Sequence, residues 1–78
     1  MMNQTIQEMR QAYIDAETRQ RAAYRRAVWL EQRLYEARTE EEYSAISAEL
    51  EQWEKKLQEL SAIAMTARYA YTAASFAI

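Results

Sequence analysis

The chain has 78 residues, of which 50% are apolar and 28% charged, with a formal net charge of −2 and no Cys, His, Gly or Pro. The lack of Cys excludes disulfides, and the lack of both Cys and His excludes a zinc site of the usual kind. An average chain of this length holds roughly nine Gly and Pro residues, and their absence excludes phosphate-binding loops and the usual left-handed turns.

The first predicted helix covers about residues 3–37. Its apolar or small residues recur at alternating spacings of three and four, which is the a/d pattern of a coiled coil. They are Ile6, Met9, Tyr13, Ala16, Ala23, Ala27, Leu30, Leu34 and Ala37. Gln20 is the one polar residue on this line.

A turn is predicted at about residues 38–40. If the first helix continued, its apolar line would run through Glu41, Ser44 and Glu51, whereas the apolar pattern restarts at Tyr43. Thr39 is a candidate N-cap, and Thr39 to Glu42 matches the capping-box pattern. Without a Gly to end the first helix, the exact boundary stays open.

The second predicted helix covers about residues 40–77. Its apolar line is again unbroken and consists of Tyr43, Ile46, Leu50, Trp53, Leu57, Leu60, Ala64, Ala67, Tyr71, Ala74 and Ile78. The two lines match when the chain folds back near residue 40. Leu34 then lies beside Ile46, Leu30 beside Leu50, and Tyr13 beside Ala67.

These patterns predict one all-α domain, residues 1–78, built as an antiparallel, coiled-coil-like hairpin of two long helices. Gln20 would face Leu60. A single polar residue on such a line commonly fixes the register of the helices. The alternative is a partly exposed Gln that packs only through its aliphatic stem.

Several large apolar residues do not belong to either line. Tyr24, Val28 and Tyr35 fall within about 40° of one another on a straight helix. The candidate interaction face comprises Tyr24, Val28, Trp29, Tyr35, Ile63, Tyr69 and Phe76. Because contiguous exposed apolar patches usually mark interfaces, we expect a homodimer that forms a four-helix bundle. The alternative is that long side chains cover these residues within one hairpin.

Four arginines crowd the middle of the first helix, and Arg21 and Arg25 are the candidate contacts for an anionic partner. Small dimeric hairpins such as Rop bind RNA, an analogy of fold only. A structural role is favoured for the others, because Arg26 can pair with Glu49, and Arg33 with Glu42 or Glu49, across the hairpin.

No arrangement of residues predicts catalysis, a cofactor, a metal or a small-molecule substrate. Without His, Ser and Thr lack the usual base, and the paired Glu-x-x-His motifs of di-iron bundles cannot form. Glu40, Glu41 and Glu42 suit the positive end of a helix dipole.

The sequence is therefore most typical of a non-enzymatic protein-interaction module, a small adaptor or inhibitor of the size carried by phages or plasmids. The partner would be a second copy, another protein, or both. One alternative is a structural subunit of a larger assembly, and another is a Rop-like RNA-binding hairpin. A cytoplasmic location is expected because the first residues contain no apolar run typical of a signal peptide, and no stretch is apolar enough to span a membrane.

Overall fold

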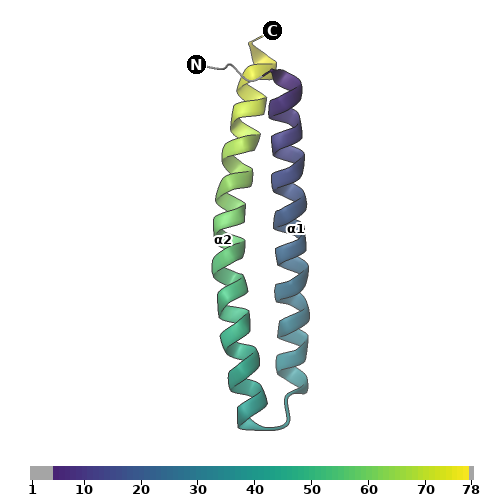
Figure 1. Ribbon diagram of the computed structural model, residues 1–78, viewed down its shortest axis with the longest axis vertical. Coiled ribbons are helices and arrows are strands. Elements are labelled where there is room, and N and C mark those ends of the chain that lie inside the picture. The colour runs from purple at the N-terminus through teal and green to yellow at the C-terminus, as the bar shows by residue number, and fades with distance from the viewer. Residues whose placement is uncertain (1–4, 78) are drawn as a thin grey trace.

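The computed structural model describes residues 5–77 and shows two long helices side by side. Helix α1 runs from Ile6–Glu36 and α2 from Glu40–Phe76, so both ends of the chain lie at one end of the rod (Figure 1). The principal extents of the rod are 58 × 20 × 14 Å. The prediction of an all-helical, antiparallel hairpin is confirmed for this part of the chain. Residues 3 and 4, which were included in the first predicted helix, lie outside the described residues.

The turn between the helices is made of extended backbone. Ala37 has φ −63° and ψ 133°, and Thr39 has φ −126° and ψ 158°. No residue in the range 5–77 has a positive φ. This chain therefore ends α1 without the left-handed residue that Gly commonly supplies.

Threonine hydroxyls cap both helices. The Thr39 side chain accepts a hydrogen bond from the backbone N–H of Glu42 at 3.1 Å, and Thr5 does the same for Glu8 at 3.1 Å. Half of the predicted capping box at Thr39 is changed, because the Glu42 carboxylate accepts from the N–H of Arg38 rather than of Thr39. Both caps satisfy donors that an isolated helix end would leave unpaired.

The core is the line of contact between the helices. The buried residues are Ala16, Ala23, Ala27, Leu30, Leu50 and Ala64. Leu34, Ile46 and Trp53 pack against the cluster formed by Ala27, Leu30 and Leu50, as the fold near residue 40 predicts. Nearly all other residues of the two predicted apolar lines within the described range are half-buried.

Tyr43 differs from the predicted line and is exposed. It lies in the first turn of α2, near the end of the rod, where it borders the turn residues Ala37, Arg38 and Thr39. The residue that the predicted register places beside Tyr43 is Ala37, which has a small side chain and lies just past the end of α1.

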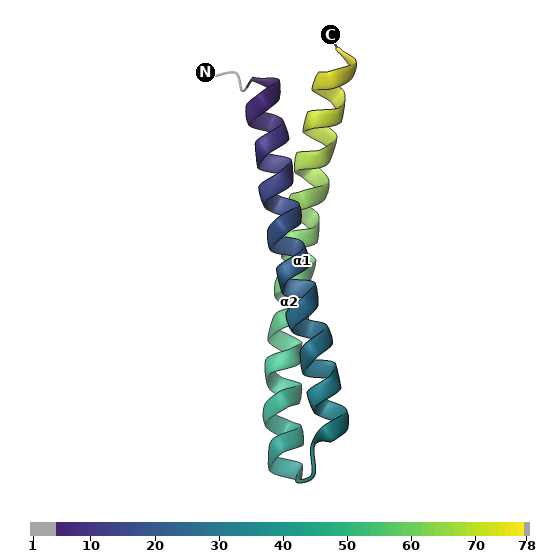
Figure 2. The same ribbon diagram turned by 90° about the vertical axis from the view of Figure 1, so that its right-hand side faces the viewer.

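Two polar contacts join the helices in this register. The half-buried Gln20 donates from Nε2 to Ser61 Oγ at 3.0 Å, so this polar residue on the apolar line has a partner on the opposite helix. Arg26 donates to Glu49 Oε1 at 2.8 Å, as predicted. Figure 2 shows that the helices cross near the middle of the rod rather than running parallel.

The Leu30 side chain is only 1% exposed and belongs to the cluster with Ala27 and Leu50. Shortening this side chain tests how much the cluster contributes to stability. We expect Leu30→Ala to lower the free energy of unfolding by about 2–5 kcal/mol, since it leaves a cavity in the Ala27–Leu50 cluster. The exposed neighbour Gln32→Ala is the control and should change it by less than about 0.5 kcal/mol. Urea unfolding followed by circular dichroism measures both, and equal losses would contradict this assignment of the core.

Candidate interaction surfaces

The line of contact divides the hairpin surface into two sides. Tyr24 and Arg26 flank this line on α1 and point about 160° apart, because each residue turns a helix by about 100°. We call the side with Tyr24, Arg21, Gln20, Leu57 and Ser61 the Tyr24 side. The opposite side carries the Arg26–Glu49 ion pair and is called the Arg26 side. Each side is a potential surface for a partner.

On the Tyr24 side, α1 presents aromatic and aliphatic residues to solvent. Tyr24 is 59% exposed and Tyr35 is 93% exposed, while Val28 between them is half-buried. Ile14 is also exposed and lies two heptads before Val28, on the same line of the helix. Tyr24, Val28 and Tyr35 all lie within α1, where their spacing keeps them within about 40° of one another.

The second half of α2 presents another apolar group. Met65, Tyr69 and Phe76 are exposed, and they lie within about 40° of one another on a straight helix. Met65 and Tyr69 line an open groove of about 410 Å³ on the Tyr24 side, together with Tyr13, Glu17, Gln20, Ser61, Ala64, Arg68 and Thr72. The apolar surface of the Tyr24 side thus passes from α1 near the turn to α2 near the chain ends.

Trp29 does not join the Tyr24 side. It lies about 100° around α1 from Val28 and contacts residues of the Arg26 side. The Arg26 guanidinium carbon lies 4.4 Å from the Trp29 ring centroid, and that of Arg33 lies 5.5 Å away. Ile63 points about 120° or more away from Met65 and Tyr69 around the axis of α2, so it does not belong to their group. The seven candidate residues therefore do not form one continuous face.

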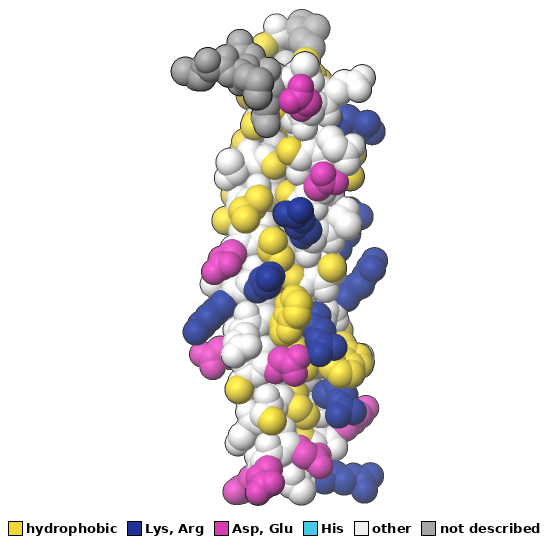
Figure 3. Space-filling view, viewed as in Figure 1, with side chains coloured by type: hydrophobic (Ala, Val, Ile, Leu, Met, Phe, Trp, Pro, Cys, Tyr) yellow, Lys and Arg dark blue, Asp and Glu magenta, His cyan; other side chains and the backbone are white. Residues whose placement is uncertain are grey.

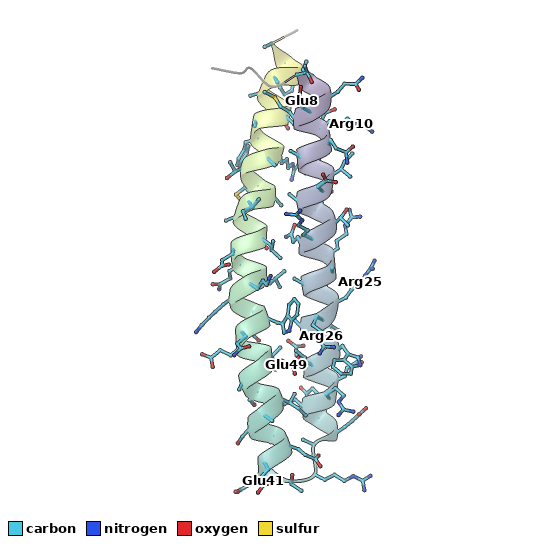
Figure 4. The ribbon with its side chains drawn as sticks, viewed as in Figure 1. Glu8, Arg10, Arg25, Arg26, Glu41 and Glu49 are labelled. Atoms are coloured by element: carbon cyan, nitrogen blue, oxygen red, sulfur yellow. The ribbon has the colours of Figure 1, made fainter. Side chains whose placement is uncertain are left out.

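The arginines of α1 differ in whether they form ion pairs with acidic residues. Arg21 forms an exposed ion pair with Glu17 at 3.5 Å, whereas Arg25 points away from α2 (Figure 4). Arg33 forms no ion pair with any residue in the range 5–77 and instead contacts the Trp29 ring. Of the two candidate basic contacts, Arg25 is the one that forms no ion pair within residues 5–77.

Figure 3 looks onto the Arg26 side. Apolar side chains form a strip along the junction of the helices, and Lys and Arg side chains stand on both sides of it. Figure 4 gives the same view and shows Arg26 and Glu49 pointing toward one another from the two helices. The Arg26 side therefore has an apolar strip along the junction of the helices, and Lys and Arg side chains flank this strip near the middle of the rod.

A polar network on the Tyr24 side was not predicted. The Tyr13 and Tyr71 rings stack with centroids 6.2 Å apart, and the Tyr13 hydroxyl donates to Glu17 Oε1 at 2.9 Å. The hydrogen bond to Glu17 is the main cause that raises the pKa of Tyr13 above its ordinary value of 10.0, and burial and the Glu17 charge add to it. Arg68 and Arg21 act in the opposite direction. The i to i+4 spacing of Tyr13 and Glu17 is the sequence signal that could have indicated their hydrogen bond.

Residues 5–77 contain neither a cluster of metal-ligating side chains nor a membrane-spanning helix. Carboxylates do not gather in groups of three or more that could hold a metal ion. Neither of the two helices, over the residues described, contains a segment long and apolar enough to cross a membrane.

Comparison of the chain with protein families, with curated proteins and with solved structures gives no match. The surfaces described above are therefore the basis for the functional argument.

The Tyr13–Glu17 hydrogen bond predicts a pH effect with a definite sign. Glu17→Ala should lower the pKa of Tyr13, because it removes the acceptor that favours the neutral phenol. A pKa raised by folding gives stabilisation that is present below 10.0 and lost as the pH rises through the folded value. NMR titration of the tyrosine Cζ resonances measures this shift, with the distant exposed residue Glu31→Ala as the control. An unchanged Tyr13 titration in Glu17→Ala would rule out the hydrogen bond as its cause.

Proposed function

We propose that this chain is a non-enzymatic, cytoplasmic protein-interaction module that binds its partner through the apolar surface of the Tyr24 side. The observation that carries the proposal is the exposure of Tyr24 and Tyr35 beside the half-buried Val28. Aromatic residues of this kind dominate the binding energy of many interfaces because they bury a large area with few rotatable bonds.

The simplest partner is a second copy of the chain, which gives a two-fold dimer and a four-helix bundle. Two features support this choice. The hairpin buries only six residues among those described, so its own core is thin for a protein of this size. In addition, an antiparallel arrangement of two copies places the α1 apolar residues near the turn of one hairpin against the Met65 and Tyr69 region of the other.

Charges on the Tyr24 side are compatible with that arrangement. The half near the turn carries Glu31, Glu51 and Glu54, and the half near the chain ends carries Arg10, Arg68 and the Arg21–Glu17 ion pair. A two-fold axis across the middle of the rod would bring the acidic half of each copy to the basic half of the other. Complementary charges of this kind favour one orientation over its alternatives.

A structural subunit of a larger assembly is the second candidate. Phe76, in the last turn of α2, is 86% exposed, and Ile63 is exposed on the part of α2 that points away from Met65. A dimer joined through the Tyr24 side would leave Ile63 uncovered. Docking of this half of α2 against other chains would cover both residues.

A nucleic-acid-binding role receives less support. Arg26 is paired with Glu49 and Arg21 with Glu17, so two of the clustered arginines already have acidic partners. The Trp29 ring has two guanidinium groups over it, which leaves little room for a stacked base. This alternative depends on Arg19 and Arg25, the two clustered arginines that form no ion pair within residues 5–77.

Light scattering after size exclusion tests the dimer at micromolar concentration. We expect a mass of twice the chain mass of 9.2 kDa for the native protein. Tyr24→Glu combined with Tyr35→Glu should give a monomer, because it places two charges in the proposed contact. Thr18→Glu combined with Gln32→Glu adds the same charge on the outward line of α1 and should leave the dimer intact.

A native mass of one chain would contradict the homodimer, and a dimer unaffected by the tyrosine substitutions would contradict the choice of side. A monomeric result leaves a foreign partner as the remaining form of the proposal. Purification of the tagged protein from its host, followed by mass spectrometry, then tests it. Recovery of the same proteins with the tyrosine variant as with the native chain would exclude the Tyr24 side.

A further inference from the structure

The Arg26 side contains a groove that the proposed dimer does not use. It is lined by Arg19, Ala22 and Ala23 from α1 and by Trp53, Lys56 and Leu60 from α2, and its volume is about 440 Å³. Ala23 is buried, and Trp53 and Leu60 are half-buried. The hollow exists because two small side chains on α1 lie opposite two large ones on α2. The floor of the groove is therefore apolar.

The walls of the groove carry two like charges. Arg19 and Lys56 occupy the positions one heptad away from Arg26 and Glu49, which form the ion pair at 2.8 Å. At the groove, the acidic member of this pattern is replaced by Lys56. Neither Arg19 nor Lys56 forms an ion pair within residues 5–77, although Lys56 Nζ lies 6.0 Å from the Trp53 ring centroid.

The nearby carboxylates Asp15 and Glu59 form no ion pair with either cation within residues 5–77. Asp15, four residues before Arg19, accepts a hydrogen bond from Gln11 Nε2 at 2.9 Å. Glu59 lies three residues after Lys56 and is exposed to solvent, without an ion pair among the described residues. Two cations that face each other across a groove repel, so an anionic group placed between them is favoured.

The groove continues as an apolar surface toward the chain ends. One heptad further, the equivalent positions are Ala12 and the exposed Ile63. An occupant therefore has to present apolar side chains along the groove and negative charge beside them. An amphipathic helix with acidic residues flanking its apolar line has this chemistry, and helices commonly bind in grooves between two others.

A second copy of the chain is a poor occupant. Arg19 and Lys56 lie near the middle of their helices, so a two-fold axis through this side would bring these cations close to those of the other copy. A nucleic acid fits less well because the floor is made of Ala, Leu and a half-buried Trp rather than of open aromatic faces.

We propose that the Arg19–Lys56 groove binds an acidic amphipathic helix of another protein, with its apolar residues over Ala22, Ala23 and Trp53 and its carboxylates at Arg19 and Lys56. This site lies on the side opposite Tyr24 and does not depend on dimerisation.

Fluorescence anisotropy with labelled peptides tests the proposal on the full chain. The probe is a peptide of roughly 20 residues, long enough to be partly helical, with Leu on the a and d positions and Glu on the flanking positions. A matched peptide carries Lys in place of Glu, and a single-stranded RNA of mixed sequence is the third probe. We expect binding of the Glu peptide alone, weakening as salt concentration rises.

Variants locate the site. Arg19→Glu combined with Lys56→Glu should weaken binding of the Glu peptide by about tenfold or more. Arg25→Glu combined with Lys55→Glu makes the same charge change at exposed positions on the same two helices, and should weaken it by less than about threefold. Ala22→Leu, at an exposed position, should also weaken binding because the larger side chain fills part of the groove above its apolar floor. Arg19→Gln combined with Lys56→Gln repeats the test if charge reversal disturbs the helical circular dichroism.

Four results would overturn the proposal. They are no binding of the Glu peptide, equal binding of the Lys peptide, equal loss in the Arg25 and Lys55 control, and RNA binding that requires Arg19 and Lys56.

Discussion

Alanine side chains lie buried between α1 and α2 at Ala16, Ala23, Ala27 and Ala64, and among residues 5–77 the other buried residues are Leu30 and Leu50. Small side chains allow two helices to approach closely, but each removes little apolar area from water. The hairpin therefore gains a well-defined register at the cost of a thin core. Several larger apolar residues, such as Tyr24 and Trp29, lie off the line of contact and remain exposed on the two sides.

The fold followed from the sequence because helix geometry converts spacing directly into direction. Residues three and four apart lie on one stripe of a helix. The two apolar lines, and the restart of the pattern at Tyr43, therefore predict both the hairpin and its register. Thr39 was found by the same local logic. Thr5 and Glu8 form an equivalent pattern that was overlooked, because the first helix was expected to begin near residue 3. The exposure of Tyr43 and the reach of Glu42 to Arg38 depend on the turn conformation, which spacing does not specify.

The candidate surface was only partly predictable. Tyr24, Val28 and Tyr35 could be grouped by angle alone, and the same angles separate Trp29 from them. Its place beside Arg26 and Arg33 is a further step, because two guanidinium groups over one ring require particular side-chain rotamers. The groove at Arg19 needed knowledge of packing as well. The register places Lys56 opposite Arg19, but the hollow there also depends on the small side chain of Ala22 and the large one of Trp53, both of which line it.

The two sides of the hairpin differ in their ability to pair with a copy of themselves. On the Tyr24 side the charges change sign between the two halves of the rod, so a two-fold axis brings opposite charges together. On the Arg26 side the cations lie near the middle, so the same axis brings like charges together. A dimer joined through the Tyr24 sides would therefore carry its two Arg19–Lys56 grooves on opposite outer faces. Such a particle would be bivalent for an acidic helix, and a partner with two such helices on a linker that spans both grooves would bind it more tightly than either groove binds one helix.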